Sequence, residues 1–186
     1  MPTRDDAFNL LKQYNTDALI THGLAVESAM RHFAKKFGED EEKWGIVGLL
    51  HDLDYEQFPD EHCYKTQEIM TPLGYSDEII RAIMSHAYGM CTDIEPLSPM
   101  EKTLYAVDEL TGLITACALV RPSKSVMDLE VKSVKKKFKQ KSFAAGASRE
   151  VITKGAEMLD MELGDLIQEV ILAMRNNATV LGLDIK

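Results

Sequence analysis

Hydrophobic residues recur at helical spacing along almost the whole of this chain. The stretch 17–37 is a clear example, in which the apolar positions are Leu19, Ile20, Leu24, Ala25, Met30 and Phe33. Strict alternation of polar and apolar residues, which is typical of strands, is nearly absent. The pattern therefore predicts an all-α protein.

Residues that favour helix ends divide this pattern into separate helices. Ser98 begins the sharpest one, because Pro99 stands at the first helical position and Glu101 completes a capping box. Asp40 and Ser76 are similar N-terminal caps. On these signals we expect a single-domain bundle of about eight helices, over residues 5–14, 17–37, 40–51, 62–70, 76–86, 98–120, 148–159 and 162–176.

The composition is that of one globular domain without disulfides. The chain has 186 residues, 45% of them hydrophobic, and we expect 1–186 to form one domain. Its three cysteines are widely spaced and are interpreted as buried small residues. Residues 1–6 do not resemble a signal peptide, and the longest apolar run, Leu113–Val120, is shorter than the about 20 residues that span a bilayer. We expect a reduced, cytoplasmic protein with no membrane partner.

The net charge of the chain limits the classes of ligand that it is expected to bind. A net charge of −9 argues against general nucleic-acid binding, which requires a basic surface. Lysines crowd the segment 132–141, which we interpret as a solvated face, with substrate contact as the alternative. A small anionic substrate remains compatible with the composition. The sequence does not indicate an oligomeric state.

The dipeptide His51-Asp52 closes the apolar run Gly45–Leu50 and is the first candidate for chemistry. A buried charge without a partner is costly, and a metal ion accepts an imidazole and a carboxylate side by side. Asp108 is a second candidate, because its neighbours Ala106 and Val107 are apolar. Such an acid is either half-exposed or faces a cation.

With His22 included, this pattern resembles the HD superfamily of metal-dependent phosphohydrolases. His22 matches the first histidine of the family, His51 and Asp52 its name-giving pair, and Asp108 its distal aspartate. The segments around His62 and His86 resemble the further histidines of two-metal members, an HDIG-type pattern. No Gly-Tyr-Pro motif follows the pair, which argues against the HD-GYP branch that cleaves cyclic dinucleotides.

The resemblance implies a helical bundle of the HD-domain type over residues 18–120, with 121–186 as a C-terminal helical extension. It implies six metal ligands, namely His22, His51, Asp52, His62, His86 and Asp108. These donors suit one or two divalent transition-metal ions (iron, manganese, cobalt, nickel or zinc), with Asp52 as the bridge. His62 follows His51 at a spacing of only eleven positions, and if this loop is too short the site holds one ion. His62 and His86 would then lie behind the ligands or contact the substrate.

The resemblance also implies an activity. We expect a phosphohydrolase that cleaves a phosphate ester of a small molecule, nucleotides among the candidates, with a water activated by metal. One alternative is a di-iron oxygenase, because some relatives use the same ligands to cleave C–C or C–P bonds. Another is a non-catalytic, metal-stabilised ligand-binding module, which the basic C-terminal third favours.

Residues near the expected ligands are candidates for the remaining roles. Lys65 follows His62 by one helical turn and is the candidate for holding the substrate phosphate, with Arg121 as a second clamp. Asp54 or Glu56 is the candidate general acid for the leaving group. The fifth histidine, His32, lies between basic residues and is interpreted as exposed and structural.

Overall fold

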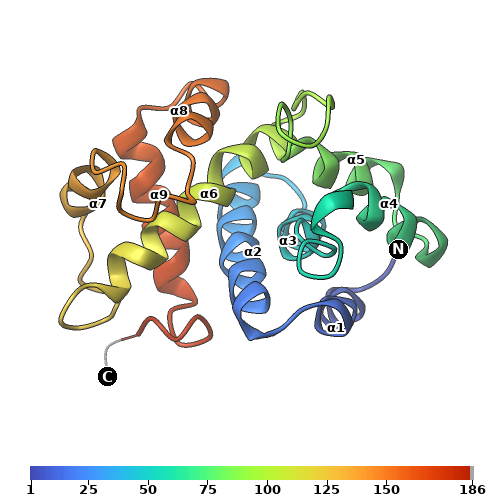
Figure 1. Ribbon diagram of the computed structural model, residues 1–186, viewed down its shortest axis with the longest axis horizontal. Coiled ribbons are helices and arrows are strands. Elements are labelled where there is room, and N and C mark those ends of the chain that lie inside the picture. The colour runs from blue at the N-terminus through green and yellow to red at the C-terminus, as the bar shows by residue number, and fades with distance from the viewer. Residues whose placement is uncertain (185–186) are drawn as a thin grey trace.

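The computed structural model describes residues 1–184, and in this range the protein is helical throughout and has no strand (Figure 1). It has nine α-helices and two short 3₁₀ turns, η1 (Pro59–Glu61) and η2 (Thr71–Leu73). The expected all-α class is confirmed. The helices are α1 (Arg4–Tyr14), α2 (Asp17–Phe37), α3 (Glu41–Leu50), α4 (Tyr64–Met70), α5 (Asp77–Ser85), α6 (Pro99–Leu119), α7 (Val131–Phe138), α8 (Arg149–Met158) and α9 (Leu163–Asn176).

The residues predicted to begin three of the helices form the expected N-terminal caps. The Ser98 hydroxyl accepts from the Glu101 backbone amide, and the Glu101 carboxylate accepts from the Ser98 amide, so the capping box of α6 is complete. The side chains of Asp40 and Ser76 cap α3 and α5 in the same way. These caps fix where three of the helices that surround the site begin.

Helix α7 is the element that the sequence did not predict. It lies inside the lysine-rich segment, where the charges obscure a short apolar stripe of Val131, Val134 and Phe138. Val134 is fully buried, and α7 contacts both α6 and α9. The predicted helix 62–70 is also shorter than expected, because η1 precedes it and α4 begins at Tyr64.

The two longest helices, α2 and α6, run through the middle of the molecule, with α1 and α3–α5 on one side and α7–α9 on the other (Figure 1). Helices α2 and α3 approach very closely. A Cβ atom on Gly48 would lie 2.9 Å from the carbonyl oxygen of Val26, and one on Gly23 would lie 2.9 Å from that of Leu49. Only glycine permits this contact, which holds the end of α3 against α2.

Two surface interpretations need correction. His32 is half-buried rather than exposed, and its Nε2 lies 2.6 Å from a Glu169 carboxylate oxygen, which links α2 to α9. Cys63 and Cys117 are buried as expected, but Cys91 is exposed. Within residues 1–184, no helix combines the length and the apolar character that crossing a membrane would require.

Candidate metal centre

Four helices and one loop bring the six predicted ligands together. His22 lies on α2, and His51 and Asp52 follow the last turn of α3. His62 lies between η1 and α4, His86 caps the C-terminus of α5, and Asp108 lies in the middle of α6. The site is thus assembled from residues far apart in the sequence.

The first group of donors is formed by His22, His51, Asp52 and Asp108, whose donor atoms lie within 4.8 Å of one another. The Oδ1 atom of Asp108 is 3.0 Å from Nε2 of His22 and 3.1 Å from Nε2 of His51. The two Nε2 atoms are 3.1 Å apart. Two nitrogens and two carboxylates therefore converge on one small volume, a donor set that suits a divalent transition metal.

Asp52 connects this group to a second one. Its Oδ2 atom lies 3.6 Å from Nε2 of His22 and 3.4 Å from Nε2 of His51. Its Oδ1 atom lies 3.4 Å from Nε2 of His62 and 3.4 Å from Nε2 of His86. Each carboxylate oxygen thus faces its own pair of histidines, which is the arrangement that a bridging ligand requires.

The second group is centred on His62 and His86, whose Nε2 atoms are 3.2 Å apart. The loop after His51 is therefore long enough to bring His62 to the site, and the backbone reverses at Cys63, which has φ +72°. This removes the reason for expecting a single ion, although the number of ions stays a prediction.

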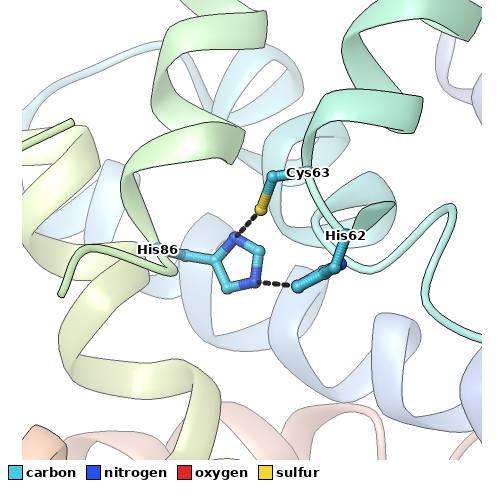
Figure 2. Close-up of side chains that lie close together, drawn as sticks. All are labelled: His62, Cys63 and His86. Atoms are coloured by element: carbon cyan, nitrogen blue, oxygen red, sulfur yellow. Dashed lines mark hydrogen bonds between the residues drawn. The ribbon is translucent and has the colours of Figure 1, made fainter. Parts of the chain in front are cut away.

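Cys63 belongs to the same group of possible donors and was not identified from the sequence. Figure 2 shows that its sulfur lies at one nitrogen of the His86 ring, while His62 lies at the other. The Sγ atom is 4.0 Å from Nδ1 of His86. Burial raises the pKa of this thiol, but His62 and His86 outweigh burial, so that the pKa lies below its usual value.

Hydrogen bonds fix the orientation of three imidazole rings. Nδ1 of His51 donates to the carbonyl oxygen of Gly48 at 2.7 Å, and Nδ1 of His86 donates to that of Ile83. Nδ1 of His62 donates to Oδ1 of Asp54 at 2.7 Å. In neutral rings this tautomer, which follows from the hydrogen-bond partners, leaves the Nε2 lone pairs directed into the site. The Nε2 atoms lie only 3.1–3.2 Å apart within each pair of rings, so their lone pairs repel unless a metal ion or a proton lies at the site.

The electrostatics of the site favour positive charge. Burial lowers the pKa of His51, but Asp52 and Asp108 overcome this and raise it to about 10. Burial likewise lowers the pKa of His62, and its hydrogen bond to Asp54 raises it to about 9. Burial raises the pKa of Asp108, yet His51 and His22 hold it well below its usual range. The donor set therefore fits a bound cation.

A cavity of about 500 Å³ opens onto these donors. Five of the six predicted ligands line it, and His51 is buried behind them. The other walls are small or uncharged side chains together with one acid. They are Tyr55, Ala87, Met90, Cys91, Glu109, Gly112, Ala144, Gly146 and Ala147.

The four other predicted site residues do not line this cavity, and their roles stay predictions. Lys65 pairs with Glu68 at 2.7 Å, and Arg121 forms two hydrogen bonds with Asp128. Neither cation is placed to hold a substrate in the cavity.

Asp54 and Glu56 are likewise engaged in structural contacts. Asp54 is fully buried, and its Oδ2 atom accepts from the Thr66 amide at 2.8 Å, so it orients His62 rather than meeting a leaving group. Glu56 accepts from the Thr16 amide at 2.8 Å, at the start of α2. Asp54 thus contacts His62, and Glu56 contacts the residue that precedes α2.

The structure adds wall residues that the sequence did not indicate. Glu109 follows Asp108 on α6, and its Oε2 atom accepts from the Ser148 amide at 3.2 Å. Burial, together with Asp108, raises the pKa of Glu109. The loop of residues 139–148 supplies Ala144, Gly146 and Ala147, which have no side-chain chemistry that a motif could reveal.

A comparison with protein families agrees with this geometry. The family model described as the HD domain matches residues 19–113. The match contains all six predicted ligands and ends within α6, so the predicted core boundary at residue 120 and the extension beyond it stay predictions. No curated protein and no solved structure matches the chain.

Proposed function

Because the chain belongs to the HD domain family, we propose that it is a metal-dependent phosphohydrolase that cleaves a phosphate ester of a small molecule. One observation carries this proposal. The two oxygens of Asp52 face two separate pairs of histidines at 3.4–3.6 Å. Sites for phosphoryl transfer in other proteins hold two ions about 3.5–4 Å apart, a spacing that a bridging carboxylate suits.

The proposed ligands divide into two sets around Asp52. His22, His51 and Asp108 would hold one ion with Oδ2 of Asp52, and His62 and His86 would hold another with Oδ1. When bound, such ions supply Lewis-acid chemistry, in that they activate a water for attack on phosphorus and neutralise charge on the phosphate oxygens.

The protein itself provides orientation. The backbone carbonyl of Gly48 keeps a proton on Nδ1 of His51, and the carboxylate of Asp54 keeps one on Nδ1 of His62. The Nε2 lone pair of each ring is then available to bind a metal ion. His51, His62 and His86 are at most 7% exposed, so their rings are held by packing as well as by hydrogen bonds. The substrate approaches from the cavity, on the side where Asp52 and Asp108 remain partly accessible.

The experiment begins with metal analysis of the purified protein by plasma mass spectrometry. The protein loaded with manganese, cobalt, nickel, zinc or ferrous iron is then assayed for phosphate release from p-nitrophenyl phosphate and from nucleoside monophosphates. We expect bound metal, metal-dependent release, and loss of both in Asp52→Ala. Glu56→Gln, which removes a charge four residues away but outside the cavity, is the matched control.

Two results would overturn the proposal. The first is a protein that binds no metal and whose Asp52→Ala variant behaves as the native chain does. The second is iron-dependent uptake of dioxygen without phosphate release from any ester, which would instead support the oxygenase alternative.

A further inference from the structure

The cavity walls contain one charged side chain besides the proposed ligands. Glu109 is that residue, and among the described residues that line the cavity there is no lysine or arginine. A substrate phosphate would therefore find its positive partners only at the proposed metal centre. Additional phosphate groups, as in nucleoside polyphosphates, would have no cation to meet.

The Glu109 carboxylate is half-buried, and no lysine or arginine within residues 1–184 forms an ion pair with it. Its hydrogen bond comes from the neutral backbone amide of Ser148. Because Glu109 lines the cavity and its hydrogen-bond donor is uncharged, its carboxylate is placed to pair with a cationic group of a ligand.

The wall formed by the loop 139–148 leaves room for such a ligand. Ala144, Gly146 and Ala147 face the cavity with little or no side chain. The guanidinium of Arg149 joins this loop to the end of α7, because its three nitrogens lie within hydrogen-bonding distance of six main-chain carbonyl oxygens. These belong to Lys137, Phe138, Gln140, Phe143, Ala144 and Ala147. The space in the cavity is therefore built into the fold.

Charge balance indicates what fills it. If the proposed function holds, two divalent cations are compensated by Asp52, Asp108 and a phosphate dianion. The negative charge of Glu109 is then left over, in a partly desolvated cavity where a charge-assisted hydrogen bond is strong.

We propose that the substrate is a small phosphomonoester that carries a primary amine, and that Glu109 binds its ammonium group. This inference rests on the proposed function and makes Glu109 a residue that determines specificity. The amine replaces the missing cationic partner of Glu109, while the phosphate lies at the metal centre.

The test uses calorimetry on the metal-loaded protein with two phosphonates of equal size, 3-aminopropylphosphonate and butylphosphonate. Their C–P bonds are not esters, so binding is measured without hydrolysis. We expect the amine to bind about tenfold or more tightly in the native protein, since a hydrogen bond to a charged group contributes about 1.5–3 kcal/mol. In Glu109→Gln this difference should disappear, because the amide can still accept from the Ser148 amide but carries no charge.

Glu150→Gln is the matched control, because it removes an exposed carboxylate that does not line the cavity, and it should retain the preference for the amine. Coinciding thermal unfolding curves of the three proteins would show that the Glu109 variant is folded. Equal affinities for the two phosphonates in the native protein, or a preference that survives in Glu109→Gln, would overturn the inference.

Hydrolysis of phosphoethanolamine and propyl phosphate separates this inference from the proposed function. Comparable kcat/KM values for the two esters would support the function and overturn the inference about the amine. Release of phosphate from neither ester, combined with a Glu109-dependent preference for the aminophosphonate, would overturn the hydrolase function and support an amine site at Glu109.

Discussion

Replacing Asp54 with Asn should weaken one half of the proposed two-ion centre and leave the other intact. Asp54 accepts two hydrogen bonds in a fully buried position, from Nδ1 of His62 at 2.7 Å and from the Thr66 amide at 2.8 Å. An asparagine has the same size but only one accepting oxygen. Its NH₂ group would therefore face a donor, either on His62 or on Thr66.

The magnitude follows from this loss. Changing a residue that orients a metal ligand typically costs about 10- to 100-fold in metal affinity, or about 1.4–2.7 kcal/mol. We expect that loss for the ion that His62 and His86 are proposed to hold. The ion held by His22, His51 and Asp108 should keep its affinity, because none of these three contacts Asp54 in a hydrogen bond. Leaving a buried donor without its partner should also lower the free energy of unfolding by about 1–3 kcal/mol.

Calorimetric titration of the metal-free protein with Mn²⁺ or Co²⁺ measures both affinities. Native protein should show two tight sites, and Asp54→Asn one tight and one weakened site. Glu56→Gln is the control, since its side-chain oxygen can still accept from Thr16 and it lies outside the cavity. Equal weakening of both sites in a protein that remains folded, or unchanged affinity at both, would refute the assignment of Asp54 as the residue that positions His62.

Four further results are expected. Arg149→Met should lower the free energy of unfolding by about 2–4 kcal/mol, because several loop carbonyls lose their hydrogen-bond donor. The same change should speed proteolysis within residues 139–148, and an unchanged cleavage rate would contradict this expectation. Burial raises the pKa of Glu101, but Arg81 and two backbone amides outweigh burial and lower this pKa. Glu101 therefore contributes stability that is present at neutral pH and is lost as the pH falls through its pKa in the folded protein. The difference in urea stability between native protein and Glu101→Gln should therefore shrink below about pH 4, and a difference that stays constant with pH would count against the pairing. Gly48→Ala should destabilise the protein by about 1–3 kcal/mol, because the new methyl group would lie 2.9 Å from the carbonyl oxygen of Val26. Gly112→Ala should not destabilise it, because a methyl group there meets no atom within 4 Å. Equal urea midpoints for the two variants would reject this explanation. Removal of metal with a chelator should lower the melting temperature, since a ligand bound only by the native state stabilises it, and identical melting curves with and without the chelator would argue against a bound ion.

The sequence predicted the helices whose signals are local. The Ser98 capping box and the Asp40 cap lie within a few residues of the helices they begin, and both act as expected. Helix α7 was not predicted, because its stripe of Val131, Val134 and Phe138 is short and becomes significant only against α6 and α9. Tertiary packing, rather than local preference, determines that element.

The candidate site was predictable where residue type carries the chemistry. Histidines and aspartates at the spacing of a known family indicated six donors, and the structure brings all six together. The roles of Lys65 and Arg121 were inferred from proximity along the chain, and both side chains instead pair with acids that lie a few residues away. Glu109 and the wall of small residues depend on how α8 and its preceding loop lie against α6, which no motif encodes.

The hydrogen bonds of Arg149 have a consequence for how this protein can evolve. All six oxygens within hydrogen-bonding distance of its guanidinium are main-chain carbonyls, which every amino acid possesses. The contacts that Arg149 makes therefore do not depend on which side chains the loop carries, apart from the positive φ of Ala144. Substitutions at positions such as Gly146 and Ala147 could then alter which molecules fit the cavity without disturbing the fold. A single arginine would thus allow related proteins to acquire new substrates while keeping one metal centre.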